Sequence, residues 1–145
     1  MLINEIKNSI KNAIVKVDNS IIFHFDEIKH TKFPFIFVGL KDFKIQAQDN
    51  LNKRFCKLVF ELCGMKSNEN KPDELFELQE VLSKSLLPVI EFKNKKIATD
   101  NVFFMVSHKM LIMNFELNFY INEENKEYEL MQELDFSIKE NKNAR

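Results

Sequence analysis

The 145-residue sequence has no tryptophan, two glycines, three prolines and two cysteines, and only two of its basic residues are arginines. Two glycines nearly exclude glycine-rich phosphate loops, which need several glycines to bring the backbone close to a ligand. The net charge is −1 and the arginines are Arg54 and Arg145, whereas nucleic-acid-binding domains usually carry an arginine-rich basic excess. The composition therefore predicts no specific nucleic-acid recognition.

Cys56 and Cys63 are the two cysteines of the chain. On one strand they would lie about 23 Å apart, too far for a disulfide, whereas a turn between them would allow one. Two thiols without a nearby histidine make a poor zinc site, so reduced, mostly buried cysteines in an intracellular protein are expected. Neither a signal peptide nor a membrane span is expected, because no stretch approaches about 18 apolar residues.

The length and the 45% content of hydrophobic residues predict one folded domain, over residues 1–140, with a frayed tail at 141–145. Helical spacing of apolar residues predicts an amphipathic helix over Leu2–Val17. A second helix is expected to begin near Asn70 or Lys71, with Pro72 in its first turn, and Pro88 ends it.

Alternating or dense apolar runs predict a sheet. The longest alternation places every second residue from Leu111 to Ile121 on one, apolar side of a strand. The residues between them, Asn114 among them, fall on an opposite face that water can wet. Two strands should form a long antiparallel hairpin around Asp49–Asn50, and Phe43 and Ile45 would allow its first strand to continue. The expected fold is therefore α+β, a mainly antiparallel (mixed) sheet with two helices packed on it. The expected strands are 21–25, 33–40, 53–62, 89–92, 95–99, 102–108, 109–122 and 134–138.

The fifteen phenylalanines allow two interpretations. Most alternate along strands as core residues do, whereas some lie near strand ends, where an interface between molecules could use them. The expected core set is Phe35, Phe37, Phe60, Phe115 and Phe119, and the possible interface set is Phe33, Phe43, Phe92 and Phe103.

A catalytic site is not evident from the sequence, and no catalytic residue, cofactor-binding residue or metal ligand is assigned. The acidic pairs Asp26–Glu27 and Glu123–Glu124 are more typical of a solvated surface than of a metal site. A small hydrolase or ligand-binding domain would require His24 and His108 to meet in space.

Charge is unevenly distributed, although it sums to nearly zero. Residues 41–57 carry five basic and two acidic groups, and residues 123–140 carry seven acidic and two basic groups. These segments are either two solvated surfaces or complementary patches that dock between neighbouring subunits.

The order, lengths and patterns of these segments together resemble the small phage tail terminator (tail-completion) proteins of prophages and phage-tail-like particles. The resemblance covers nearly the whole chain. It is carried by the segments LINEIKNSIKNAI, KFPFIFVGL, LNKRFCKLVFEL, KPDELFELQEVLSKSL, MLIMNFELNFYI and MQELDFSIK.

This resemblance implies a non-enzymatic protein that assembles into a ring, expected to be a hexamer, and caps the tail tube to end its polymerisation. The implied partners are other copies of the chain, the tail tube protein, and sheath or neck and connector proteins. The implied location is the virion tail or a tail-like particle, and the bacterial cytoplasm during assembly. A head–tail connector is the alternative within the same particle. The candidate contact residues, in the hairpin loop 41–53 and the acidic turn 123–127, are Lys41, Asp42, Phe43, Lys44, Lys53, Arg54, Glu123, Glu124 and Glu127.

Overall fold

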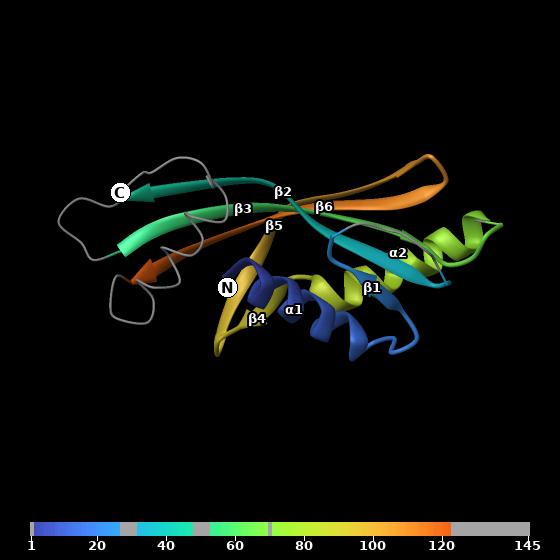
Figure 1. Cartoon of the computed structure of the whole chain (residues 1–145), viewed down its shortest axis with the longest axis horizontal. Coiled ribbons are helices and arrows are strands. Elements are labelled where there is room, and N and C mark those ends of the chain that lie inside the picture. Colours follow the sequence, from blue (N-terminus) through green and yellow to red (C-terminus); the bar gives the residue numbers. More distant parts are fainter. Residues whose placement is uncertain (1, 27–31, 48–52, 70, 123–145) are drawn as a thin grey trace.

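Two helices lie against one face of a curled six-stranded sheet (Figure 1). The computed structural model describes residues 2–26, 32–47, 53–69 and 71–122. Across the sheet the strands follow the order β1-β2-β3-β6-β5-β4, and only β1 and β2 pair in parallel. The predicted α+β class is confirmed. In chain order the elements are α1 (Leu2–Val15), β1 (Ile22–His24), β2 (Phe35–Ala47), β3 (Lys53–Met65), α2 (Pro72–Leu86), β4 (Val89–Phe92), β5 (Lys95–Ser107) and β6 (Met110–Asn122).

Helix α1 forms because its apolar residues recur at helical spacing, and it buries that stripe against α2, β4 and β2. It ends at Val15, two residues before the predicted end. A turn follows in which Oδ1 of Asp18 accepts hydrogen bonds from Ser20 Oγ at 2.6 Å and from Ser20 N at 3.0 Å. These bonds lower the pKa of Asp18, because they favour its charged form.

Helix α2 begins as predicted, with Pro72 in its first turn. The Glu74 carboxylate accepts hydrogen bonds from Ser67 Oγ at 2.6 Å and from the backbone N–H of Lys71 at 3.2 Å. This arrangement satisfies a backbone donor at the helix start and places negative charge at the positive end of the helix dipole. The buried leucines of the helix lie on the side that packs against β3, β6 and β4. They are Leu75, Leu78, Leu82 and Leu86.

Strands β2 and β3 form the predicted antiparallel hairpin, whose tip at residues 48–52 lies outside the described residues. The expectation of a loop from Lys41 onward is wrong, because β2 continues to Ala47 and pairs with β3 along this length. Phe43 and Ile45 extend the strand, since their side chains pack against the core. Strand β3 also runs past its predicted end, to Met65.

Strand β5 is a single strand, not the two that the sequence suggested. A bulge between Asp100 and Phe103 interrupts its alternation, and Asn101 has a φ of 50°. His108 and Lys109, with φ of 51° and 63°, form the turn between β5 and β6. The prediction that His108 ends one strand and Lys109 begins the next is therefore off by one residue on each side. Strands β4 and β5 begin where they were predicted, at 89 and 95, and a tight turn at Lys93 and Asn94, with φ of 51° and 65°, joins them.

The sheet bends at one level because two bulges face each other across its centre. In β2 the register shifts between Leu40 and Asp42, beside Phe60 and Val59 of β3. In β5 the shift lies beside residue 115 of β6, which pairs with Phe60. Bulges increase local twist, so β2 and β5 turn more strongly than the β3–β6 pair, whose register is unbroken. Beyond this level the ends of β2, β3 and β6 project past the helices (Figure 1).

The core lies between the helices and the inner sheet face, and the rings of Phe60 and Phe115 stack at its centre with centroids 5.8 Å apart. Of the five phenylalanines predicted in the core, Phe35, Phe60 and Phe115 are buried, whereas Phe37 and Phe119 are half-buried. Of the interface set, Phe92 is buried and Phe103 is exposed. The predicted strand 134–138 and the tail 141–145 lie outside the described residues.

We expect Phe60→Ala to lower the free energy of unfolding by about 3–5 kcal/mol, because truncation leaves a cavity beside Phe115. The matched control is Phe76→Ala on the exposed side of α2, whose effect should stay within about 0.5 kcal/mol. Urea unfolding measures both values. Equal effects of the two substitutions would contradict this location of the core.

Glu74→Gln should lower the Tm at neutral pH, because the pKa of Glu74 is held below its ordinary value by the hydrogen bonds from Ser67 and Lys71. A depressed carboxyl pKa stabilises the fold above the pKa of the unfolded chain, and this stabilisation disappears as pH falls through the lower folded pKa. The Tm difference between wild type and variant should therefore shrink in acid. Glu80→Gln, at an exposed position of the same helix, is the control and should show no such pH dependence.

Candidate interaction surface

The sheet face turned away from the helices, here called the open face, carries a row of apolar side chains. The strand register aligns Phe37 of β2, Cys63 of β3, Ile112 of β6 and Met105 of β5. The first three are half-buried and Met105 is 47% exposed. Within this row, the apolar side chain of β5 is therefore more exposed than those of β2, β3 and β6.

Strand β5 is the sheet edge over residues 101–107. Strand β4 pairs with β5 only up to Ala98, and no other described strand lies beside the remainder. Three side chains of this segment, Phe103, Met105 and Val106, are 51%, 47% and 56% exposed. The sequence reasoning singled out Phe103 but missed Met105 and Val106, because a dense apolar run is typical of a strand buried on both faces.

Lys41 and Asp42, two of the predicted contact residues, lie at the β2 bulge. Nζ of Lys41 lies 3.9 Å from Oε2 of Glu61 and donates a hydrogen bond of 3.4 Å to Oδ1 of Asn114. Asn114 lies on the open face, as the alternation of β6 predicts, but it is only 4% exposed. The aliphatic part of a lysine can cover such a neighbour while its ammonium group stays in water.

The other described contact candidates are divided between the two faces. Lys44 is exposed on the open face, at the level of Lys57 in β3. Phe43 and Arg54 lie on the face toward the helices, where they pair in register with buried Leu58 and Ile121. Lys53 belongs to β3, but its side chain is outside the described residues, as are Glu123, Glu124 and Glu127. The structure thus places Lys41, Asp42 and Lys44, and not Phe43 or Arg54, together on one accessible surface.

A depression of about 380 Å³ lies on the open face between the two bulges. Lys41 and Asp42 form one wall, and Asn101 and Phe103 form the other. Val59 and Asn114 are among the residues between these walls. The depression therefore connects the predicted charged residues of β2 with the exposed apolar residues of β5.

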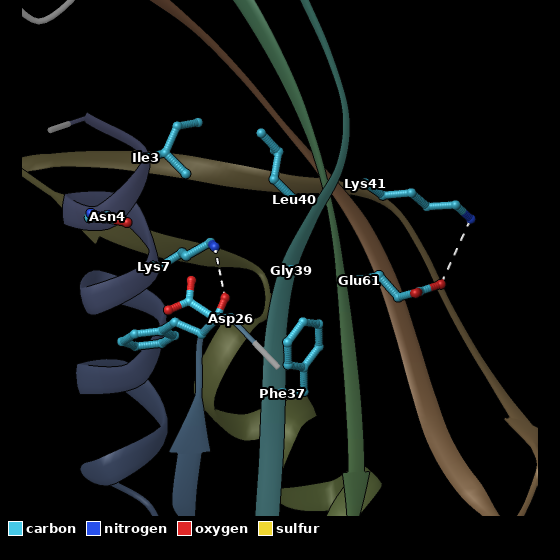
Figure 2. Close-up of a pocket in the computed structure, with 10 residues that line it drawn as sticks. Ile3, Asn4, Lys7, Asp26, Phe37, Gly39, Leu40, Lys41 and Glu61 are labelled. Carbon is cyan, nitrogen blue, oxygen red and sulfur yellow. Dashed lines mark hydrogen bonds and ion pairs between the residues drawn. The ribbon is translucent and has the colours of Figure 1, made fainter. Parts of the chain in front are cut away.

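A second depression, of about 630 Å³, lies between α1 and the part of β2 that follows the end of β1 (Figure 2). Nζ of Lys7 donates a 3.2 Å hydrogen bond to the carbonyl oxygen of Phe25. Burial lowers the pKa of Lys7, and the negative charge of Asp26 opposes this shift. Figure 2 shows Lys7 and Asp26 on the α1 side of β2, with the Lys41–Glu61 pair on the other side. The lining therefore carries two lysines and two carboxylates, which give it no net charge and indicate no particular ligand.

The two histidines that a hydrolase would need do not meet. His24 lies on β1, where its ring contacts Phe35 edge-on at 6.0 Å, and His108 lies in the turn between β5 and β6. Strands β2 and β3 separate β1 from β6. The geometry that this alternative required is therefore not present.

Both cysteines are free thiols on β3, as predicted, and they lie on opposite faces of the sheet. Cys56 is buried beneath the helices, whereas Cys63 is half-buried on the open face. Burial raises the pKa of the Cys63 thiol, and the negative charge of Glu61 raises it further. Cys63 is therefore a thiol, with little thiolate character, at neutral pH.

Over the described ranges, no group of three or more histidine, cysteine or acidic side chains is arranged to hold a metal ion. Neither α1 nor α2, the helices of those ranges, is long and apolar enough to cross a membrane. Comparison with protein-family models and with curated proteins finds none that matches this chain.

Proposed function

We propose that this protein is a structural subunit of the phage tail terminator type, which assembles into a ring, expected to be a hexamer, that caps a tail tube. The observation that carries the proposal is the apolar edge of β5, where Phe103, Met105 and Val106 are all about half exposed. An unpaired edge with large apolar side chains is a surface that favours association with another chain. The type of assembly, a ring, comes from the resemblance of the element order and patterns to those of phage tail terminator proteins.

The placement of this edge favours a ring over an isolated pair. The exposed apolar edge of β5 and the charged surface of Lys41, Asp42 and Lys44 lie on different strands of the sheet. A contact between two different surfaces of identical chains is heterologous, and such a contact closes into a ring when its rotation fits. The surface around Lys41, Asp42 and Lys44 adds charges beside the β2 edge that can fix the orientation of the neighbour.

In this proposal the ring acts by geometry. One ring face fits the last ring of the tube and occupies the sites where the next tube subunits would add, which ends polymerisation. The other face is available to neck or connector proteins. The chain then belongs to the virion tail or a tail-like particle and assembles in the bacterial cytoplasm. No chemical step is required of any residue.

Changing Phe103 and Met105 together to aspartate should prevent ring formation, because both side chains lie on the exposed edge and charge there opposes burial. Light scattering should then give the 17.2 kDa monomer in place of an assembly of about 100 kDa, the mass of six copies. Phe76→Asp, at the 60% exposed position on α2, is the control and should leave the assembly intact. A wild-type protein that is monomeric at all concentrations would contradict the ring.

Reversing Lys41, Lys44 and Lys53 to glutamate should weaken ring formation or tail capping, because it inverts the charge beside the β2 edge. The control carries the same charge change at Lys16, Lys84 and Lys95, which are exposed elsewhere. Electron microscopy of particles measures tail length in each case. Tails of normal length with the first variant would remove these lysines from the contact surface.

Deleting the gene distinguishes the terminator from a head–tail connector. Loss of a terminator should give tails of uncontrolled length, because nothing then blocks further tube rings. Loss of a connector should give tails of normal length that do not join heads. The second outcome would overturn the proposed function.

A further inference from the structure

The edge of β2 beyond Phe37 is free over the described residues. Strand β1 pairs with β2 only at Phe35, Ile36 and Phe37. From Gly39 to Ala47, β2 has β3 on one side and no described strand on the other (Figure 1). A free edge presents unpaired backbone N–H and C=O groups, which another strand can satisfy.

The side chains along this edge have a different character on each face. Phe43 and Ile45 lie on the helix side, half-buried and in contact with the core, although the sheet here reaches past the helices. Lys44 and Gln46 alternate with them and are exposed on the open face. Lys44 forms no ion pair within the described part of the chain. The edge therefore fits a strand with apolar residues on one face and an acidic group on the other.

The segment 133–138 of the same chain has this pattern. Leu134, Phe136 and Ile138 alternate with Glu133, Asp135 and Ser137. It belongs to the acidic stretch 123–140, which carries seven acidic and two basic groups, and the β2–β3 segment 41–57 carries five basic and two acidic groups. Both the alternation and the charge are complementary to the free edge of β2.

The chain is long enough to reach this edge from where β6 ends. Asn122, the last residue of β6, pairs with Lys53, and the neighbouring Arg54 pairs with Ala47 at the end of β2. The path from β6 to the outer side of β2 crosses three strand spacings, about 15 Å. The ten residues 123–132 can span about 33 Å when extended. A chain returning from Asn122 also runs antiparallel to β2, as a strand pairing beside it requires.

We propose that residues 133–138 bind in cis to the free edge of β2 as an antiparallel strand, with Asp135 opposite Lys44. In this register Phe136 and Leu134 lie opposite Phe43 and Ile45 on the helix side. Glu133 then lies opposite Gln46 on the open face. The binding is intramolecular and does not depend on ring formation.

Hydrogen exchange of the full-length protein tests this pairing. The amides of residues 133–138 and of 42–47 should exchange more slowly in the wild type than in unstructured peptides of the same sequences. A deletion of residues 128–145 should speed exchange at 42–47 and leave the core strands protected. Unprotected exchange at 133–138 in the wild type, or unchanged exchange at 42–47 after the deletion, would overturn the proposal.

Charge exchange tests the register. Lys44→Glu and Asp135→Lys should each reduce protection at 133–138 about two- to fivefold, because like charges then face each other across the strands. The variant that combines both should regain the wild-type value. Lys95→Glu, at an exposed position of the β4–β5 hairpin, is the control and should have no effect at 133–138. Failure of the combined variant to regain protection would reject the proposed register.

Mixing the two single variants distinguishes the chain's own segment from that of a neighbouring copy. If residues 133–138 bind in cis, the mixture should show the same reduced protection as each variant alone. Regained protection in the mixture would mean that the segment binds to a second copy, and it would overturn the intramolecular proposal. Because light scattering measures the ring separately, protection at 133–138 without a ring would contradict only the proposed function.

Discussion

The pairing of β3 with β6 is the constraint on which the rest of the structure depends. Their inner side chains form the surface on which α2 packs, and α1 lies beside it against α2, β4 and β2. Phe60 and Phe115 stack at the centre of the β3–β6 pair. The two flanking strands each carry a bulge at this level, which increases the local twist of the sheet. The ends of β2, β3 and β6 extend past the helices (Figure 1), and over the described residues β2 beyond Phe37 and β5 beyond Thr99 each have a strand on one side only.

Alternation within one strand predicted most of this core. In β3 and β6 each side chain's face follows from its position, because a period of two is fixed by the extended backbone, and the inner residues are buried as expected. The same reasoning divided β5 into two strands, because the bulge at Asn101 interrupts its period. The bulge is a feature of the register between β5 and β6, so the sequence of β5 alone does not show it.

The features of the candidate surface were harder to predict because they depend on which strands are neighbours. Asn114 follows the alternation of β6, but it is buried and accepts a hydrogen bond from Lys41, which is 73 residues away in the sequence. Met105 and Val106 look like core residues in sequence and are exposed because β4 leaves β5 at Ala98. Lys41, Asp42 and Lys44 were predicted in a hairpin loop and lie instead on strand β2, whose alternation places Phe43 on the helix side.

The two free edges differ in chemistry, and this difference separates their roles. The β2 edge carries Lys41 and Lys44 and a bulge, which are features that prevent unspecific pairing of an edge strand. A strand with acidic groups opposite these lysines can pair with the β2 edge in spite of its charge. Residues 133–138 of the same chain, with Glu133 and Asp135, have this pattern. The segment 101–107 of β5 contains neither a charged residue nor a proline. An edge left without such protection would cause aggregation unless another chain covers it, so the β5 edge is where association between molecules has the strongest physical basis.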